Sequence, residues 1–195
     1  MKKFINQSLH QVRKLACLDF IPLLAIRLYL VPVFYVGAKS KLFKFDATVA
    51  WMGGPVADGG LGLPFPTLMV IIAFITEAAA VILLSLGLAT RLMALQLLVF
   101  LIIAALTVHW VHGWPVIAGN TDESTLRLSG LMEWLQDYFP GRYNYVTEYM
   151  DPVMLNNGVE FTVTYMIMLS VLLFFGAGRF VSCDYWIKRI YYNHK

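Results

Sequence analysis

The sequence contains little charge. Charged side chains make up 14% of its 195 residues, whereas hydrophobic residues make up 59%. Soluble domains carry about a quarter charged residues, because a folded chain needs polar groups to cover its surface. A water-soluble globular protein, a disordered chain and a coiled coil are therefore not expected, and the lipid bilayer is the remaining solvent.

Other absences narrow the range of functions. The chain has two cysteines, Cys17 and Cys183, and no Cys-x-x-Cys motif, which argues against a disulfide scaffold, a zinc ribbon or a thioredoxin-type redox pair. No basic run with interleaved aromatic residues occurs in a polar context, so no nucleic acid partner is expected. A nucleophile elbow, a phosphate-binding glycine loop and a dinucleotide fingerprint are also missing from the sequence.

Four long apolar runs dominate what is present. Each approaches the ~20 residues that a helix needs to cross about 30 Å of hydrocarbon. None of them alternates with the period of two that marks a membrane β-strand. The sequence therefore predicts an all-α integral membrane protein, a single domain over residues 1–195, whose four-helix bundle spans residues 20–37, 66–86, 92–110 and 158–177.

The segments around these runs also carry patterns. Residues 1–18 place apolar side chains on one helical arc and basic ones off it, which predicts an interfacial helix or a solvated basic tail. Glycine and proline in residues 39–65 predict an irregular or re-entrant segment. In the acidic segment 111–157, apolar residues recur at helical spacing and predict an amphipathic helix over residues 124–139.

The distribution of Lys and Arg predicts an orientation. Basic residues gather in both terminal tails and at Arg91, whereas segment 111–157 holds six acidic residues and two arginines. The positive-inside rule then places both termini in the cytoplasm of a bacterial cell, with segment 111–157 outside the inner membrane. Lys39, Lys41 and Lys44 fall on the outer side and weaken this argument.

Two ionisable residues lie inside the apolar runs. Arg27 follows the start of the first run by about seven residues, and Glu77 precedes the end of the second by about nine. At ~1.5 Å per residue these depths nearly match, so the two side chains are predicted to meet. They would form an ion pair that only locks two helices together, or the charged floor of a polar ligand site or a step of a proton path.

A second group of polar residues is predicted at the outer mouth of the bundle. His109 and His112 are three residues apart and share a helix face, Glu160 opens the fourth run, and Lys41 follows the first. Both histidines with Glu160 could bind copper or zinc. Alternatively, His109 could exchange a proton with a quinol head group. As a third interpretation, these are interfacial residues and His109 only makes a local hydrogen bond.

Taken in order, these motifs resemble those of the DoxX family of small four-helix membrane proteins. The matching elements are Arg27, Gly37-x-x-x-Lys41, Glu77 ten residues before Gly87-Leu-Ala-Thr-Arg91, His109, Asn157-Gly158-x-Glu160, and Gly176-Ala-Gly-Arg179 followed by Ser182-x-Asp184. The acidic insertion over residues 120–151 is similar to that of the HvfX-type branch, which is found beside genes that mature copper-handling peptides.

The resemblance implies an inner-membrane protein that supports an oxidoreductase system and binds a quinone or similar small ligand in its bundle. The ligand-binding residues would be Arg27, Lys41, Glu77, His109 and Glu160. Two alternatives stay open. One is a membrane protein that binds or handles copper or zinc through His109, His112 and Glu160. The other is a scaffold in the lipid bilayer whose acidic outer segment docks a periplasmic redox or metal-handling protein.

Overall fold

The computed structural model describes residues 18–193, so the interfacial helix expected over residues 1–18 lies outside the described part apart from Leu18. The described residues form helices, loops and one isolated β-bridge between Ile117 and Leu155. This confirms the prediction of an all-α fold. The chain divides into two compact units, which are described separately. The first unit contains the residues up to Ile103 and from Tyr165 onward, and the second unit contains residues 104–164.

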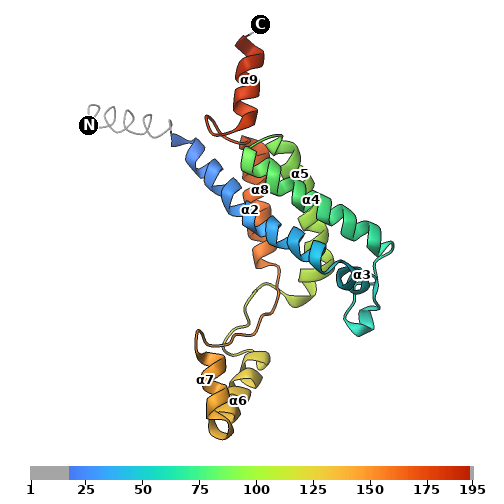
Figure 1. The fold of residues 1–195 in the computed structure, drawn as a ribbon, viewed down its shortest axis with the longest axis vertical. Helices are drawn as coiled ribbons and strands as arrows, with labels where there is room; N and C mark the ends of the chain where they lie inside the picture. The colour runs from blue at the N-terminus through green and yellow to red at the C-terminus, as the bar shows by residue number, and fades with distance from the viewer. Residues whose placement is uncertain (1–17, 194–195) are drawn as a thin grey trace, which may run out of the picture. The chain divides into compact units, whose positions relative to one another are not determined.

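Three helical stretches of the described residues are long and apolar enough to cross a membrane (Figure 1). They are α2 (Phe20–Phe43), α4 (Pro66–Leu86) and the stretch Thr90–His112. That stretch consists of α5 (Thr90–Ala104), the π-helical turn η3 (Ala105–His109) and the 3-10 turn η4 (Trp110–His112). These helices make the chain an integral membrane protein.

A fourth apolar helix, α8 (Glu160–Phe175), has 16 residues. At ~1.5 Å per residue it is about 24 Å long, which is shorter than the span expected over residues 158–177. Gly176 adopts φ +80° directly after Phe175, and such a left-handed glycine commonly ends a helix. The amphipathic α9 (Cys183–Asn193) follows it in the chain.

The region after residue 37 differs from the expectation. Helix α2 continues to Phe43, and residues 45–53 form a further helix, α3 (Phe45–Gly53), followed by the 3-10 turn η2 (Val56–Asp58). The expected irregular segment is therefore largely helical. No glycine or proline stands between Gly37 and Gly53, so nothing in that stretch forces the backbone out of the helical conformation.

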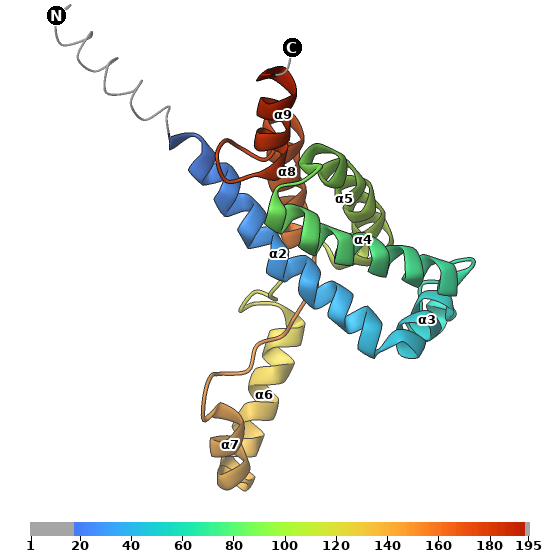
Figure 2. The same cartoon turned by 45° about the horizontal axis from the view of Figure 1, so that its top comes forward.

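The core of the first unit lies between α2, α4, α5 and α8. Helices α2 and α4 lie side by side (Figure 2). The cluster of buried side chains comprises Leu30, Phe34, Ala80, Leu84, Met93, Ala94, Leu97, Leu101, Leu169 and Leu172. Outside this core, large apolar side chains such as Ile82 and Val99 are exposed, as lipid-facing side chains are.

The second unit contains a helical hairpin. Helix α6 (Glu123–Tyr138) matches the helix predicted over residues 124–139 to within one residue, and α7 (Pro140–Thr147) follows it after Phe139. Neither helix has a fully buried residue. The side chains of the hairpin are half-buried or exposed, in keeping with an amphipathic segment.

Candidate functional site

A buried ion pair joins α2 to α4. The Lys41 ammonium donates to both carboxylate oxygens of Glu77 at 2.8 Å, and it lies 5.9 Å from the centroid of the Phe100 ring. The Glu77 side chain is 6% exposed and the Lys41 side chain is 15% exposed. A charge this deep in apolar surroundings is costly, and here the opposite charge and the ring face offset part of that cost.

Gly37 makes room for the Glu77 carboxylate. A Cβ at position 37 would lie 2.6 Å from Glu77 Oε1, closer than non-bonded atoms approach. The absence of a side chain on this turn of α2 is therefore what admits the carboxylate. Lys41 follows Gly37 by one helical turn, so the two residues share a face of α2 and approach the same residue of α4.

Arg27, which lies near the start of α2, binds backbone carbonyl groups. Its Nη1 donates to the Leu84 carbonyl at 3.2 Å and its Nη2 donates to the Val181 carbonyl at 2.6 Å. The residue is 1% exposed, and its Nε has no hydrogen-bond partner among the described residues. Gly87 leaves space for it, since a Cβ there would lie 2.1 Å from Nη1. Arg27 thus ties α2 to the C-terminal end of α4 and to the link before α9.

The predicted Arg27–Glu77 ion pair does not form, and the register of α2 against α4 explains why. Glu77 lies against Gly37, and Gly87 lies against Arg27. Gly37 follows Arg27 by ten residues and Gly87 follows Glu77 by ten, so the antiparallel helices keep one register between the two contacts. Ten residues of helix rise about 15 Å, which separates the two charged groups. The prediction assumed that the start of the first helix and the end of the second helix lie at the same depth in the membrane.

Asp184, which the sequence analysis named only as part of a family motif and gave no role, fixes the start of α5. Its Oδ1 accepts the Ala89 N–H at 2.7 Å and its Oδ2 accepts the Thr90 N–H at 2.9 Å. Its own N–H donates to the Gly87 carbonyl at 3.0 Å. An aspartate that accepts N–H groups at a helix start follows the N-cap preference, although it lies far away in the sequence. Nothing local signals such a long-range cap.

His109 makes a local hydrogen bond in the second unit. Its Nδ1 lies 2.9 Å from the Asn157 carbonyl oxygen, which can only accept, so the proton is on Nδ1. His109 ends the π-helical turn η3, and such turns often occur at functional sites. His112 takes part through its backbone, because its carbonyl accepts the Asn156 side-chain amide at 2.7 Å.

Glu160 is also held within the second unit. Its Oε2 accepts the Val116 N–H at 3.2 Å, and its own N–H donates to the Trp114 carbonyl at 3.0 Å. Among residues 18–193, no three His, Cys, Asp or Glu side chains lie together as metal ligands would. The expected group of His109, His112 and Glu160 is therefore not assembled as a metal site in this structure.

Comparison with known proteins places most of this geometry in one family. Residues 22–110 match the family model described as DoxX. This part of the chain belongs to the DoxX family. The DoxX segment runs from α2 through η4 up to Trp110, so it contains Arg27, Lys41, Glu77 and His109. The hairpin of α6 and α7, helix α8 and helix α9 lie beyond it.

One curated relative is similar to about half of this chain. The inner membrane protein YphA of Escherichia coli (strain K12) is 35% identical to this chain over 94 residues. The matched part covers 48% of this chain and 61% of that relative, so the similarity spans less than two thirds of the relative's length. No solved structure matches the chain significantly.

The sequence analysis singled out Arg27, Lys41 and Glu77 but did not pair them as the structure does. Lys41 was expected near the outer mouth with the histidines, whereas it lies inside α2 and binds Glu77. The signal available was the Gly37-x-x-x-Lys41 spacing, which puts a small residue and a cation on one helix face. Arg27 was selected as a ligand-binding residue, and its observed partners are carbonyl groups.

Proposed function

We propose that this DoxX protein resides in a bacterial inner membrane and binds the head group of a quinone, or a similarly small polar group, beside Lys41 and Glu77. The observation that carries the proposal is the Lys41–Glu77 pair enclosed among apolar helices. Ionisable residues inside a membrane mark functional sites by default. The inner-membrane assignment draws on the three long apolar helices and on the similarity to the inner membrane protein YphA.

The donor count at Lys41 supports a carbonyl-bearing ligand. An ammonium has three N–H donors, and two of them go to the oxygens of Glu77. One donor is left for a carbonyl oxygen, and the Phe100 ring beside it offers an apolar face to a planar ring. A lysine and a glutamate in contact also supply groups that can hold or release a proton when a bound quinone is reduced. Such binding would let the protein support an oxidoreductase system.

Quinone content of the purified protein tests the proposal. The full chain is extracted in a mild detergent, and the bound quinone per protein is measured by chromatography and mass spectrometry. We expect quinone in the parent and its loss in Lys41→Met and Glu77→Gln. Lys39→Met is the matched control, since Lys39 lies two residues away on α2 and is exposed. Absence of quinone from the parent, or equal amounts in all four proteins, would contradict the proposal.

The proposed topology has both termini in the cytoplasm and the α6–α7 hairpin on the periplasmic side of the inner membrane. It is supported by the basic residues of the two tails and by the acidic residues of segment 111–157. On this arrangement the Lys41–Glu77 pair lies closer to the outer end of α2, and Arg27 lies closer to the inner end. The hairpin would then be the part that is accessible to a periplasmic protein.

A further inference from the structure

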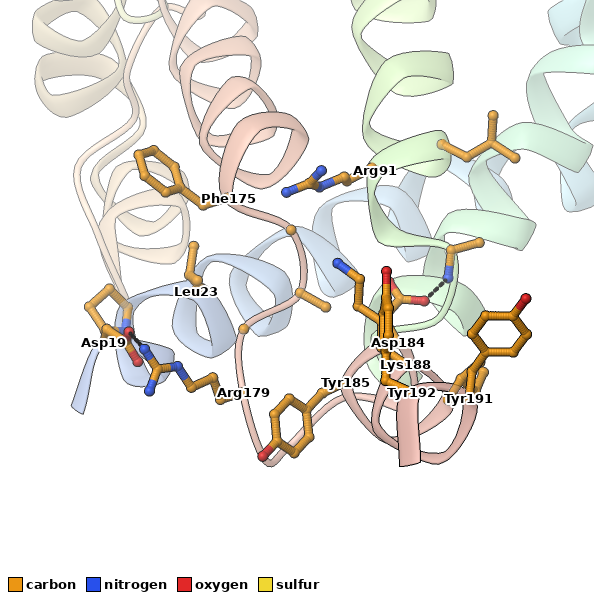
Figure 3. A pocket seen from close by; sticks show the side chains of 17 residues that line it. Asp19, Leu23, Arg91, Phe175, Arg179, Asp184, Tyr185, Lys188, Tyr191 and Tyr192 are labelled. Carbon is orange, nitrogen blue, oxygen red and sulfur yellow. Dashed lines mark hydrogen bonds and ion pairs between the residues drawn. The ribbon is translucent and has the colours of Figure 1, made fainter. Parts of the chain in front are cut away.

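A cavity opens at the end of the first unit where α2 and α5 begin and α8 ends (Figure 3). Its volume is about 980 Å³, and its walls come from α2, α5, the end of α8 with the link after it, and α9. This volume is at the upper limit of the range for small-molecule sites. The cavity lies at the start of α2, whereas Lys41 lies near the end of α2. It is therefore a separate site from the proposed quinone site.

Two positive charges in this cavity have no acidic partner. Arg91 and Lys188 line it, and neither forms an ion pair with any described residue. The two acids that also line it are already engaged. Asp19 Oδ2 lies 3.1 Å from Arg179 Nη2, and the Asp184 carboxylate accepts the N–H groups of Ala89 and Thr90. The dashed lines in Figure 3 mark the Asp19–Arg179 ion pair and the hydrogen bond from Ala89. The lining holds three cations, Arg91, Arg179 and Lys188, against the two carboxylates, so the cavity keeps one net positive charge.

The remaining wall is amphipathic. Leu23, Leu92 and Phe175 contribute apolar surface, whereas Tyr185 and Tyr192 on α9 each bring a phenol group. Leu92 is 61% exposed and Phe175 is 71% exposed, so the apolar part of the wall opens outward. Leu95, one turn further along α5, is exposed as well. An apolar path thus leads from the two cations along α5 toward the middle of the bilayer.

We propose that this cavity binds an anionic phospholipid, with its phosphate between Arg91 and Lys188 and an acyl chain along Leu92 and Leu95. Arg91 stands in the first turn of α5, at the depth where a span meets the head groups. Basic pockets between helices at this depth bind anionic head groups. A neutral quinone would leave the two cations unpaired, and a soluble anion would leave the apolar wall uncovered.

Arg91 has donors to spare for a phosphate. Its Nη2 donates to the Phe174 carbonyl at 3.0 Å, which fixes the guanidinium at the end of α8. Four of its five N–H donors are left, and guanidinium groups match phosphate oxygens in a bidentate geometry. Figure 3 shows Arg91 and Lys188 beside the chain segment that follows α8. A phosphate held by both would join the start of α5 to α9.

Lipid binding to the full chain in neutral detergent tests the proposal. The apparent affinity is measured for phosphatidylglycerol, for phosphatidylcholine and for inorganic phosphate, from the shift of the thermal transition with ligand concentration. We expect phosphatidylglycerol to bind more tightly than phosphatidylcholine. One cation beside an anionic head group is worth about fivefold in affinity, so Lys188→Gln and Arg91→Gln should each weaken binding by about that factor.

Three further variants make the result decisive. Arg189→Gln is the matched control, because Arg189 lies on α9 against the Trp186 ring and does not line the cavity. Arg91→Lys keeps the charge if Arg91→Gln fails to fold, and Lys188→Glu should abolish the preference for the anionic lipid. Equal binding of both lipids, a preference that survives Lys188→Glu, or equal stabilisation by inorganic phosphate alone would overturn the proposal.

Discussion

The Lys41 ammonium holds both oxygens of the Glu77 carboxylate at 2.8 Å, between α2 and α4. Both side chains are largely withdrawn from solvent. In water such a pair would contribute little, but between apolar helices each charge depends on the other. The stability of the helix pair and the chemistry proposed for it therefore share the same two residues.

Removing one partner of this pair should be worse than removing both. Lys41→Met or Glu77→Leu leaves a buried charge without its counterion, which typically costs about 3–5 kcal/mol. The double variant should lose less stability than either single variant, because no unpaired charge is left buried. Unfolding by a denaturing detergent, followed by tryptophan fluorescence, measures the free energies of unfolding. Additive losses would show that the two side chains do not depend on each other.

Gly37→Ala should weaken the same contact without changing a charge. The new Cβ would lie 2.6 Å from Glu77 Oε1 and push the carboxylate away from Lys41. Gly130→Ala in α6 is the matched control, because a Cβ there meets nothing within 4 Å and helix propensity should make it neutral or stabilising by up to about 1 kcal/mol. We expect a loss of stability at position 37 only, measured as a lower denaturation midpoint. In a Glu77→Ala background, the loss at position 37 should disappear.

Gly87→Ala should be more damaging than an ordinary substitution at a left-handed glycine. Gly87 has φ +62°, and a Cβ there would lie 2.1 Å from Arg27 Nη1. Gly59 has φ +80° with open space around it, so Gly59→Ala carries only the backbone strain of roughly 1–2 kcal/mol. The difference between the two denaturation midpoints reports the space that Arg27 requires. Equal losses would mean that the guanidinium moves aside at no cost.

The proposed topology predicts the pattern of cysteine labelling in intact cells. In a chain whose Cys17 and Cys183 are replaced by Ser, a single cysteine at Ser129 in α6 should react with a membrane-impermeant maleimide. A cysteine at Tyr192 in α9 should react only after the cells are opened. Both native side chains are exposed, so burial does not hide either site. The reverse pattern would place the Lys41–Glu77 pair closer to the cytoplasmic side and the proposed lipid cavity on the periplasmic side.

The sequence was sufficient for the fold class because the bilayer imposes a strong pattern. A run such as residues 66–86 must be uniformly apolar and of spanning length, and α4 has these bounds. The end of α2 was harder to place. Lys39, Lys41 and Lys44 suggest the end of a span, yet long basic side chains can stay in a helix and reach a polar partner.

The partners of the buried charges could not be read from the sequence. Pairing requires the register between two helices, and register depends on where small residues such as Gly37 and Gly87 let the backbones approach. Asp184 shows the same limit, because it caps α5 from a position 95 residues after Ala89. These contacts exist only once the helices have packed.

The two levels of contact between α2 and α4 also limit how the protein can move. Glu77 sits in the space at Gly37, and Arg27 sits in the space at Gly87, about 15 Å further along the pair. Sliding α2 by one turn, or rotating it about its axis, would pull both side chains out of their spaces at once. Helices α2 and α4 should therefore move together as one rigid pair. Any motion that accompanies ligand exchange should belong to α5, α8 or α9, which close around it.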